Sequence, residues 1–301
     1  MPELPDIELY RAALAARILD QPLDAARVSS PFLLRTVEPP LAAFVGHTVR
    51  ALRRLGKRIV FAFDDELFLV LHLMIAGRLR WKERGAKVPG KVGLAAFDFP
   101  TGTLLLTEAS PKKRAALHAL RGAPALAALD PGGIDVFTTD REGFAAVLGR
   151  ERHTLKRTLT DPHLFSGIGN AYSDEILHRA RLSPIMMTDR LSADEVTRLH
   201  DATRTLLREW IDRLQAETGD RFPEKVTAFR PEMAVHGRYG APCPDCGTPV
   251  QRIAYAENEC NYCARCQTGG KLLADRSLSR LLKADWPKTI DELELRRRGS
   301  Q

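Results

Sequence analysis

The stretch Cys243–Cys266, CPDCGTPVQRIAYAENECNYCARC, decides the fold of the C-terminal part of this chain. It holds two C-x2-C pairs, and 16 residues lie between Cys246 and Cys263. Each pair places two thiolates on one tight turn, and a β-hairpin of the intervening length brings the two turns together. Four sulfurs then close a tetrahedron around one Zn²⁺ and leave no open position for a substrate. The spacing therefore predicts a structural zinc-finger β-hairpin, with the zinc ligands Cys243, Cys246, Cys263 and Cys266.

All five cysteines lie in this stretch, and Cys260 is the one outside the two pairs. A disulfide framework would spread cysteines along a small secreted chain, whereas clustering in a chain of 301 residues indicates metal binding. We expect Cys260 to be a spare thiol. The sequence shows neither a signal-peptide pattern nor an apolar run of 18 residues, so we expect a soluble, cytoplasmic protein with no membrane partner.

The composition favours a basic globular protein of more than one domain. With 45 Lys and Arg against 38 Asp and Glu, the formal charge is +7. Such a surface attracts phosphates, although charge alone does not identify a nucleic-acid-binding protein. The hydrophobic share of 44% and the charged share of 28% exclude a disordered chain. A length of 301 residues exceeds what one hydrophobic core usually holds.

N-terminal to the zinc stretch, a strand pattern comes first and a helix pattern follows. Turn residues such as Asp64-Asp65 separate short apolar runs, which predicts an antiparallel β-sandwich or barrel. The stretch 129–133, LDPGG, is the best linker candidate at the end of this part, since proline and paired glycines stop regular structure. The expected strands are 28–34, 48–55, 58–63, 67–74, 93–99 and 103–106. The expected helices, from apolar residues at helical spacing, are 141–148, 154–159, 171–180 and 193–217.

These patterns predict an α+β multidomain chain. We expect an N-terminal β-sandwich domain with a leading helix in residues 1–131, a helical domain in 132–235, a zinc finger in 236–268 and a C-terminal tail in 269–301. The tail is partly amphipathic and ends in Arg296-Arg297-Arg298. It is either a docking helix or a solvated run of charges, and we favour the latter for residues 292–298.

The N-terminus reads MPELPD and has two interpretations. Met1 before a small residue is normally removed, which would leave Pro2 with a free secondary amine beside the carboxylate of Glu3. Alternatively the stretch only starts a helix, since Pro5 suits a first helical turn. The residues alone leave both interpretations open.

The run Phe165–Leu177, FSGIGNAYSDEIL, places two glycines and Asn170 before a helix. Backbone N–H groups at a helix start bind anions. Asn170 either caps this helix or donates its amide to a phosphate. Lys156, on the preceding expected helix, would add positive charge there.

Together the motifs MPELPD, GKR around Lys57, HLMIAG around His72, GIGNAY and the paired cysteines occur in the order of a known family. They resemble the formamidopyrimidine-DNA glycosylase / endonuclease VIII family of base-excision repair enzymes, over roughly residues 1–266. The resemblance implies a β-sandwich domain, a helix–two-turns–helix domain and a zinc finger. It implies a bifunctional DNA glycosylase and AP lyase that acts on damaged DNA, and we expect a monomer on double-stranded DNA.

The resemblance also implies roles for residues. Pro2 matches the nucleophile that attacks C1′ of the damaged nucleotide, Glu3 the acid that assists sugar-ring opening, and Lys57 a contact to the phosphate on the lesion side. The resulting iminium acidifies the C2′ proton, so β-elimination, and then δ-elimination, can follow. His72 and Asn170 match further phosphate contacts, and we add Lys156. Glu175 matches an acidic position facing the active site, or is a helix-surface acid.

The sequence departs from the family pattern at three places. Asn258 stands where the hairpin tip of the family carries a phosphate-binding arginine, so a charge-assisted contact is lost. In residues 110–115, SPKKRA, Lys112 and Lys113 keep positive charge for DNA binding, but the aromatic wedge of the family is missing. Met74 or Ile75 would then insert into the duplex, unless both are core residues. The chain also continues 35 residues past Cys266.

These departures leave a second hypothesis, a nucleic-acid-binding protein that keeps the fold but is catalytically silent or prefers single-stranded or unusual DNA. The intact Pro2-Glu3 pair argues against it, because a pure binder needs no N-terminal amine. Residues 218–233 lie where the family places its lesion-capping loop.

Overall fold

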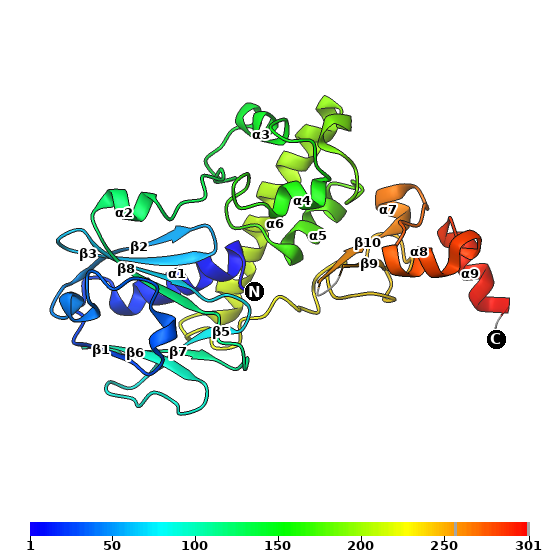
Figure 1. The fold of residues 1–301 in the computed structure, drawn as a ribbon. Helices are drawn as coiled ribbons and strands as arrows, with labels where there is room; N and C mark the ends of the chain where they lie inside the picture. The colour runs from blue at the N-terminus through cyan, green and yellow to red at the C-terminus, as the bar shows by residue number, and fades with distance from the viewer. Residues whose placement is uncertain (256–257, 300–301) are drawn as a thin grey trace. The chain divides into compact units, whose positions relative to one another are not determined.

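The computed structural model describes residues 1–255 and 258–299. They form two compact units, one of Met1–Gly133 with Arg208–Ala228, the other of Ile134–Leu207 with the described residues from Phe229 onward (Figure 1). The predicted α+β fold is confirmed: antiparallel sheets come first, helices follow, and a hairpin with clustered cysteines lies near the C-terminus. The finer division into four domains remains a prediction.

The first unit is a β-sandwich with a helix in its core. Its two four-stranded sheets have the strand orders β1-β6-β7-β5 and β2-β3-β4-β8, and all neighbouring strands are antiparallel. The leading helix α1 (Leu4–Ile18) buries Ile7, Tyr10 and Leu14 in the same core as the sheets. The strands are β1 (Ala25–Val28), β2 (Val49–Leu55), β3 (Arg58–Phe63), β4 (Leu67–His72), β5 (Gly77–Lys82), β6 (Gly93–Phe99), β7 (Gly102–Glu108) and β8 (Ala116–Arg121).

Strands β3 and β4 are buried on both faces. Phe61 and Leu69 point into the sandwich core, whereas Val60 and Val70 belong to a second apolar cluster on the opposite face. Leu126, at helix α2 (Ala123–Ala127), packs against that second cluster. Because both faces are covered, these two strands are nearly continuous apolar runs, which explains why they were recognisable in the sequence.

Other strands differ from the prediction. The strand expected at 28–34 is wrong, because the observed strand β1 covers Ala25–Val28 and Pro31 then opens a 3₁₀ helix, η1 (Pro31–Leu33). The strand expected at 67–74 ends at His72. β5 and β8 were not predicted, although the alternation of polar and apolar side chains in GRLRWK and ALHALR is the pattern of a half-buried strand.

In the second unit the predicted helices are confirmed to within a residue or so. They are α3 (Arg141–Leu148), α4 (Leu155–Thr160) and α5 (Asn170–Arg179), followed by α6 (Ala193–Thr218), whose last part belongs to the first unit. Short polar side chains cap them: Asp140 accepts from the N–H of Gly143, and Ser192 from that of Glu195. The 3₁₀ helix η3 (Thr188–Arg190) lies in this unit, whereas η2 (Leu41–Phe44) lies in the first unit.

The zinc stretch is a two-stranded hairpin, β9 (Gln251–Tyr255) with β10 (Asn258–Tyr262), followed by α7 (Ala264–Thr268). The tail contains α8 (Arg276–Leu282), η4 (Lys283–Asp285) and α9 (Ile290–Gly299). Residues 292–298, expected as a solvated run of charges, are helical, with Glu292, Leu295 and Arg296 exposed. The tail folds back on the hairpin, as described below. None of the described helices has the length and apolar character that crossing a membrane requires.

Candidate active site and metal centre

The N-terminal residues are fixed at the start of α1. Glu3 is the N-cap residue, and its backbone N–H donates to Asp6 Oδ2 at 3.0 Å, which with the Glu3 side chain forms a capping box. Pro2 and Glu3 are buried, whereas Met1 is exposed. The helix-start interpretation is therefore correct, and it does not compete with the catalytic one, because the same capping box fixes the position of Pro2.

Charged side chains surround the terminal amine. Burial lowers the pKa of the Met1 amine. The carboxylates of Glu3 and Asp6 act in the opposite direction, and the cations Arg78 and Lys57 lower the pKa further. Lys57 is half-buried and sits with Gly56 in the two-residue turn between β2 and β3, where Gly56 has φ +61°. The turn thus brings a lysine near the start of α1.

His72 ends β4 and pairs with Arg58 across the sheet. Its Nε2 is buried and has no hydrogen-bond partner among the residues that the structure describes. Burial, followed by the charges of Arg58, Lys57 and His118, lowers the pKa of His72 to about 4. His72 is therefore a neutral imidazole at neutral pH.

The turn after His72 presents two apolar side chains differently from core residues. Leu73 is buried in the sandwich core, but Met74 has φ +54° and is half-buried, and Ile75 is 55% exposed. The turn is tight: the N–H of Gly77 donates to the carbonyl oxygen of Leu73 at 2.9 Å. Ile75 is not a core residue, so the core explanation for it is wrong.

The loop 110–115 is built around the buried Glu108. The carboxylate of Glu108 accepts hydrogen bonds from the backbone N–H groups of Arg114 and Ala115 at 2.9 and 3.1 Å. Lys113 Nζ donates to the carbonyl oxygen of Glu108, so Lys113 holds the loop, whereas Lys112 is exposed.

In the second unit, Lys156 is not the surface cation that its position in the sequence suggested. Its Nζ donates to the carbonyl oxygen of Asn170, to Ser173 Oγ and to Asp174 Oδ1 at 2.6, 2.8 and 2.6 Å. All three N–H groups are thus engaged at the first turn of α5. Lys156 orders the turn that carries Asn170.

Asp174 is the centre of a buried network. Its side chain is 0% exposed, and beside Lys156 its Oδ2 lies 2.8 Å from His236 Nδ1 and accepts from the N–H of Asn261 at 3.2 Å. Glu175, next to it, is also buried and accepts from the N–H groups of residues 234, 235 and 236 at 2.7, 2.8 and 2.9 Å. Burial raises the pKa of Glu175 against the effect of these donors. The interpretation of Glu175 as a helix-surface acid is therefore wrong, because its carboxylate is buried and holds the backbone of residues 234–236.

The two asparagines of interest lie at the ends of connected elements. Asn170 is the first residue of α5, and its Nδ2 donates to the carbonyl oxygen of Glu259 in β10 at 2.9 Å. Asn258, exposed, is the neighbouring first residue of β10. α5 and the hairpin are therefore directly linked beside Asn258.

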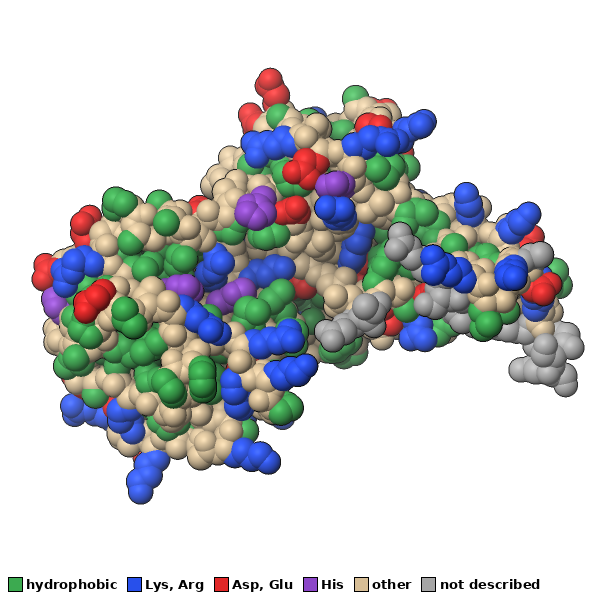
Figure 2. All heavy atoms as spheres, in the orientation of Figure 1, with side chains coloured by type: hydrophobic (Ala, Val, Ile, Leu, Met, Phe, Trp, Pro, Cys, Tyr) green, Lys and Arg blue, Asp and Glu red, His purple; other side chains and the backbone are tan. Residues whose placement is uncertain are grey.

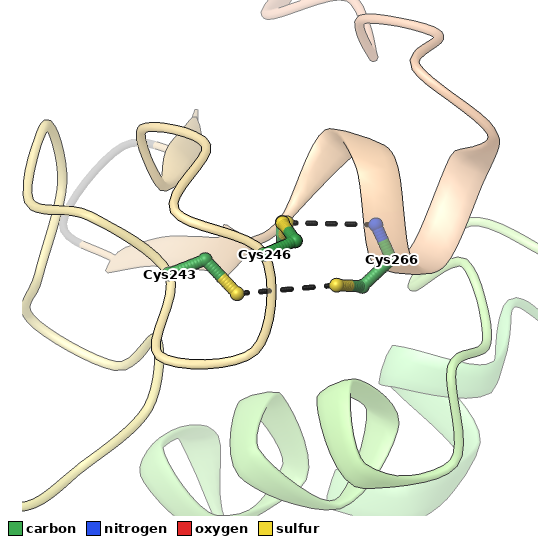
Figure 3. A group of neighbouring side chains, drawn as sticks. Cys243, Cys246 and Cys266 are labelled. Carbon is green, nitrogen blue, oxygen red and sulfur yellow. Dashed lines mark hydrogen bonds between the residues drawn. The ribbon is translucent and has the colours of Figure 1, made fainter.

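The four paired cysteines converge. Cys243 and Cys246 come from the loop before β9, Cys263 precedes α7 and Cys266 lies in α7, and the labelled side chains point toward one another (Figure 3). All four Sγ atoms lie within 4.8 Å of one another, with 3.9 Å between Cys243 and Cys266 and 3.4 Å between Cys246 and Cys263. Zn–S bonds of about 2.3 Å give a tetrahedron with edges of about 3.8 Å. The donor set therefore fits one Zn²⁺.

Several of these residues were not found from the sequence. His236 and Asn261 meet Asp174 across separations of 62 and 87 residues, and His178 Nε2 approaches Cys243 Sγ to 3.3 Å. No motif joins them, because the pairings exist only in the folded unit. Cys260 is buried, and burial raises the pKa of its thiol, in keeping with a residue outside the ligand set. Lysine and arginine side chains are spread over the face in Figure 2, with acidic ones among them.

Comparison with known proteins gives a consistent result. Residues 1–117 match the formamidopyrimidine-DNA glycosylase N-terminal domain, and residues 133–221 match the H2TH domain of the same enzyme. A formamidopyrimidine-DNA glycosylase of Thermus thermophilus is 32% identical over 280 residues, which cover 90% of this chain and 100% of the relative. An uncharacterized formamidopyrimidine-DNA glycosylase-like protein of Mycobacterium tuberculosis is 41% identical over 164 residues, 54% of this chain and 100% of that protein.

Solved structures agree. The complex of Lactococcus lactis Fpg with DNA containing an abasic site has a TM-score of 0.78 at 25% identity, covering 88% of this chain and 99% of that one. MutM in complex with DNA containing carbocyclic 8-oxo-G has the same TM-score and identity, covering 89% and 100%. The chain thus matches both domain models, aligns with a relative over that relative's full length and shares the fold of the solved structures. It belongs to the formamidopyrimidine-DNA glycosylase family.

Proposed function

We propose that this protein is a bifunctional DNA glycosylase and AP lyase of base-excision repair, with Pro2 as its nucleophile after removal of Met1. The observation that carries the proposal is the capping box at Glu3 and Asp6, which holds the N-terminus among Glu3, Asp6, Arg78 and Lys57. A nucleophilic amine must be neutral, and an ordinary α-amino group titrates near ~8. Burial lowers the pKa of the Met1 amine. Removal of Met1 would place the new terminal amine on the buried Pro2, and burial of an amine favours its neutral form.

The proposed chemistry follows from that amine. The Pro2 nitrogen bonds to C1′ while the bond from C1′ to the damaged base breaks. The nitrogen then loses its proton, the C1′–O4′ bond opens, and Glu3 assists by delivering a proton to O4′. The product is an iminium, whose electron demand acidifies C2′–H. Loss of that proton expels the 3′ phosphate by β-elimination; a further proton loss can expel the 5′ phosphate, and water then releases Pro2.

The remaining predicted site residues take supporting roles. Lys57, one of the cations that act on the terminal amine, would contact the phosphate on the lesion side, with His72 as a neutral donor beside it. The exposed Lys112 and Asn258 would bind other phosphates, which set the register of the duplex, and the half-buried Asn170 would add a contact at the start of α5. Lys156 and Lys113, whose ammonium groups are engaged internally, would position the segments that carry Asn170 and Lys112.

Extrusion of the damaged nucleotide from double-stranded DNA leaves a gap in the base stack. The exposed Ile75, with Met74 beside it, is the candidate wedge that would fill this gap. Four cysteine thiolates would hold one structural Zn²⁺, which orders the two turns of the hairpin and takes no part in the reaction. We propose a monomer that works on DNA in the cytoplasm, with residues 1–131 catalytic and residues 132–268 binding DNA.

The test is reductive trapping with borohydride on a duplex that contains one abasic site. The wild type, Pro2→Gly and Glu3→Gln are compared, after mass spectrometry has shown that Met1 is absent. Pro5→Ala is the matched control, because it changes a proline of the same helix start that carries no terminal amine. We expect a covalent adduct with the wild type and the control, and strongly reduced trapping with Pro2→Gly.

A wild type without Met1 that forms no adduct would overturn the catalytic proposal and favour the binding-only hypothesis, which the comparisons do not favour. Retention of Met1 would have the same meaning, since a blocked Pro2 cannot react. For substrate preference, equal activity on single-stranded and double-stranded DNA would contradict the expected duplex preference.

A further inference from the structure

The zinc hairpin has two outer strand edges, and on each edge a carboxylate accepts a hydrogen bond from a backbone N–H group. An isolated two-stranded hairpin is marginally stable, and its outward N–H groups need partners. On the β10 side, α5 supplies them: Asp174 Oδ2 accepts from the N–H of Asn261 at 3.2 Å, and Asn170 Nδ2 donates to the carbonyl oxygen of Glu259 at 2.9 Å. α5 therefore fixes one edge of the hairpin.

The tail supplies the corresponding group on the β9 side. Asp275 Oδ2 accepts from the N–H of Ala254 at 2.7 Å, and Asp275 is only 3% exposed. It stands immediately before α8, where its carbonyl oxygen accepts from the N–H of Ser279 at 2.8 Å. Ala254 directly precedes Tyr255, which pairs with Asn258. Asp275 thus binds the backbone of β9 one residue before Tyr255, the last residue of that strand.

The tail also adds a hydrophobic core that does not depend on metal. Leu272, Leu273 and Ile290 pack with hairpin residues that include Ile253 and Tyr262. The backbone continues this contact, since the N–H of Leu273 donates to the Tyr262 hydroxyl at 2.8 Å and the N–H of Ile290 to the carbonyl oxygen of Gly270 at 2.9 Å. The hairpin therefore lies between α5 on one side and the tail on the other.

We propose that Asp275 is a positioning residue of the DNA-binding hairpin, and that the tail holds the hairpin end with Asn258 in the conformation that binds DNA. This inference rests on the proposed function. Asn258 cannot form the bidentate charge-assisted phosphate contact of an arginine, so a rigid tip matters more for affinity here: pre-ordering lowers the entropy that binding costs. In keeping with an added element, the Lactococcus lactis Fpg structure, almost wholly aligned at 99% of its length, covers 88% of this chain.

Asp275→Ala and Asp275→Asn in the full-length zinc-loaded protein test the proposal. The asparagine keeps an oxygen acceptor for the Ala254 N–H, whereas the alanine removes it. Asp285→Ala is the matched control, since Asp285 is an exposed acid of the same tail. Hydrogen–deuterium exchange of peptides covering β9, the dissociation constant for a duplex with an abasic-site analogue, its salt dependence and the trapping rate at saturating DNA are measured.

With Asp275→Ala we expect exchange in β9 and the dissociation constant each to rise about tenfold or more, the effect of losing one buried hydrogen bond to a carboxylate. Asp275→Asn should restore most of both, and Asp285→Ala should change neither. The slope of log K against log salt should stay unchanged, because no phosphate contact is removed; the loss of one such contact would lower it by ~0.9. The trapping rate at saturating DNA should also stay unchanged.

Three results would overturn the proposal. Unchanged exchange in Asp275→Ala would show that Asp275 does not hold β9. Faster exchange with unchanged DNA affinity would show that the contact is purely structural. A lowered slope of log K against log salt would show that Asp275 affects phosphate binding directly. If the wild type neither binds nor traps DNA, the proposed function fails, while the exchange comparison still decides whether Asp275 supports the hairpin.

Discussion

The Lys156–Asp174 pair allows a sharp prediction about the second unit. The Lys156 side chain is 14% exposed and that of Asp174 is 0% exposed, with 2.6 Å between Nζ and Oδ1. Removing one partner of a buried pair costs about 3–5 kcal/mol, because the remaining charge stays buried without compensation. For Lys156→Met we expect the lower end, about 3 kcal/mol, since His236 and the N–H of Asn261 still contact Asp174 Oδ2.

The assay is equilibrium urea unfolding followed by circular dichroism, arranged as a double-mutant cycle. Its members are Lys156→Met, Asp174→Asn and the double variant, and Arg157→Met serves as the control because Arg157 is an exposed cation on the same helix. We expect the control to stay within about 0.5 kcal/mol of the wild type. The double variant should lose less free energy of unfolding than the sum of the losses in the two single variants, by about 1–3 kcal/mol. Additive effects, or a Lys156→Met variant as stable as the control, would refute the buried-pair argument.

Three further changes test the first unit and the hairpin. The pKa of His72 is lowered from 6.5 to about 4. Between pH 6.5 and 4, His72 is therefore protonated in the unfolded chain but stays neutral in the folded one. The free energy of unfolding should fall by at most about 3 kcal/mol as the pH drops from 6.5 to 4. In His72→Gln this fall should be absent when unfolding is measured against pH. Parallel curves of unfolding free energy against pH for the wild type and the variant would contradict the prediction. Asn258→Arg should tighten DNA binding and steepen the slope of log K against log salt by about 0.9, whereas an unchanged slope would place residue 258 away from phosphates. Ile75→Ala should change stability by no more than about 0.5 kcal/mol, because Ile75 is exposed, yet slow base excision from duplex more than from single strands; equal slowing of both would exclude a wedge.

Local chemistry in the sequence determined several features of this protein. The paired cysteines were recognisable because each pair is held by a turn of a few residues, and the folded chain brings the four sulfurs together as the spacing predicted. The helices at 141–148 and 193–217 follow from apolar periodicity and capping residues, which act within one or two turns. The strands β3 and β4 were visible because both of their faces are apolar.

Only the tertiary structure decided what the polar side chains do. Lys156, Lys113 and Glu175 look like surface charges in the sequence, but each meets its partners in the folded protein and takes a structural role. The contact of the tail with β9 through Asp275 was not predicted, because it depends on a hairpin edge that exists only after folding. The physical reason is the same in each case: burial and hydrogen bonding between segments tens of residues apart leave no periodic or motif signal, because the chain positions that meet are chosen by the packing of whole elements.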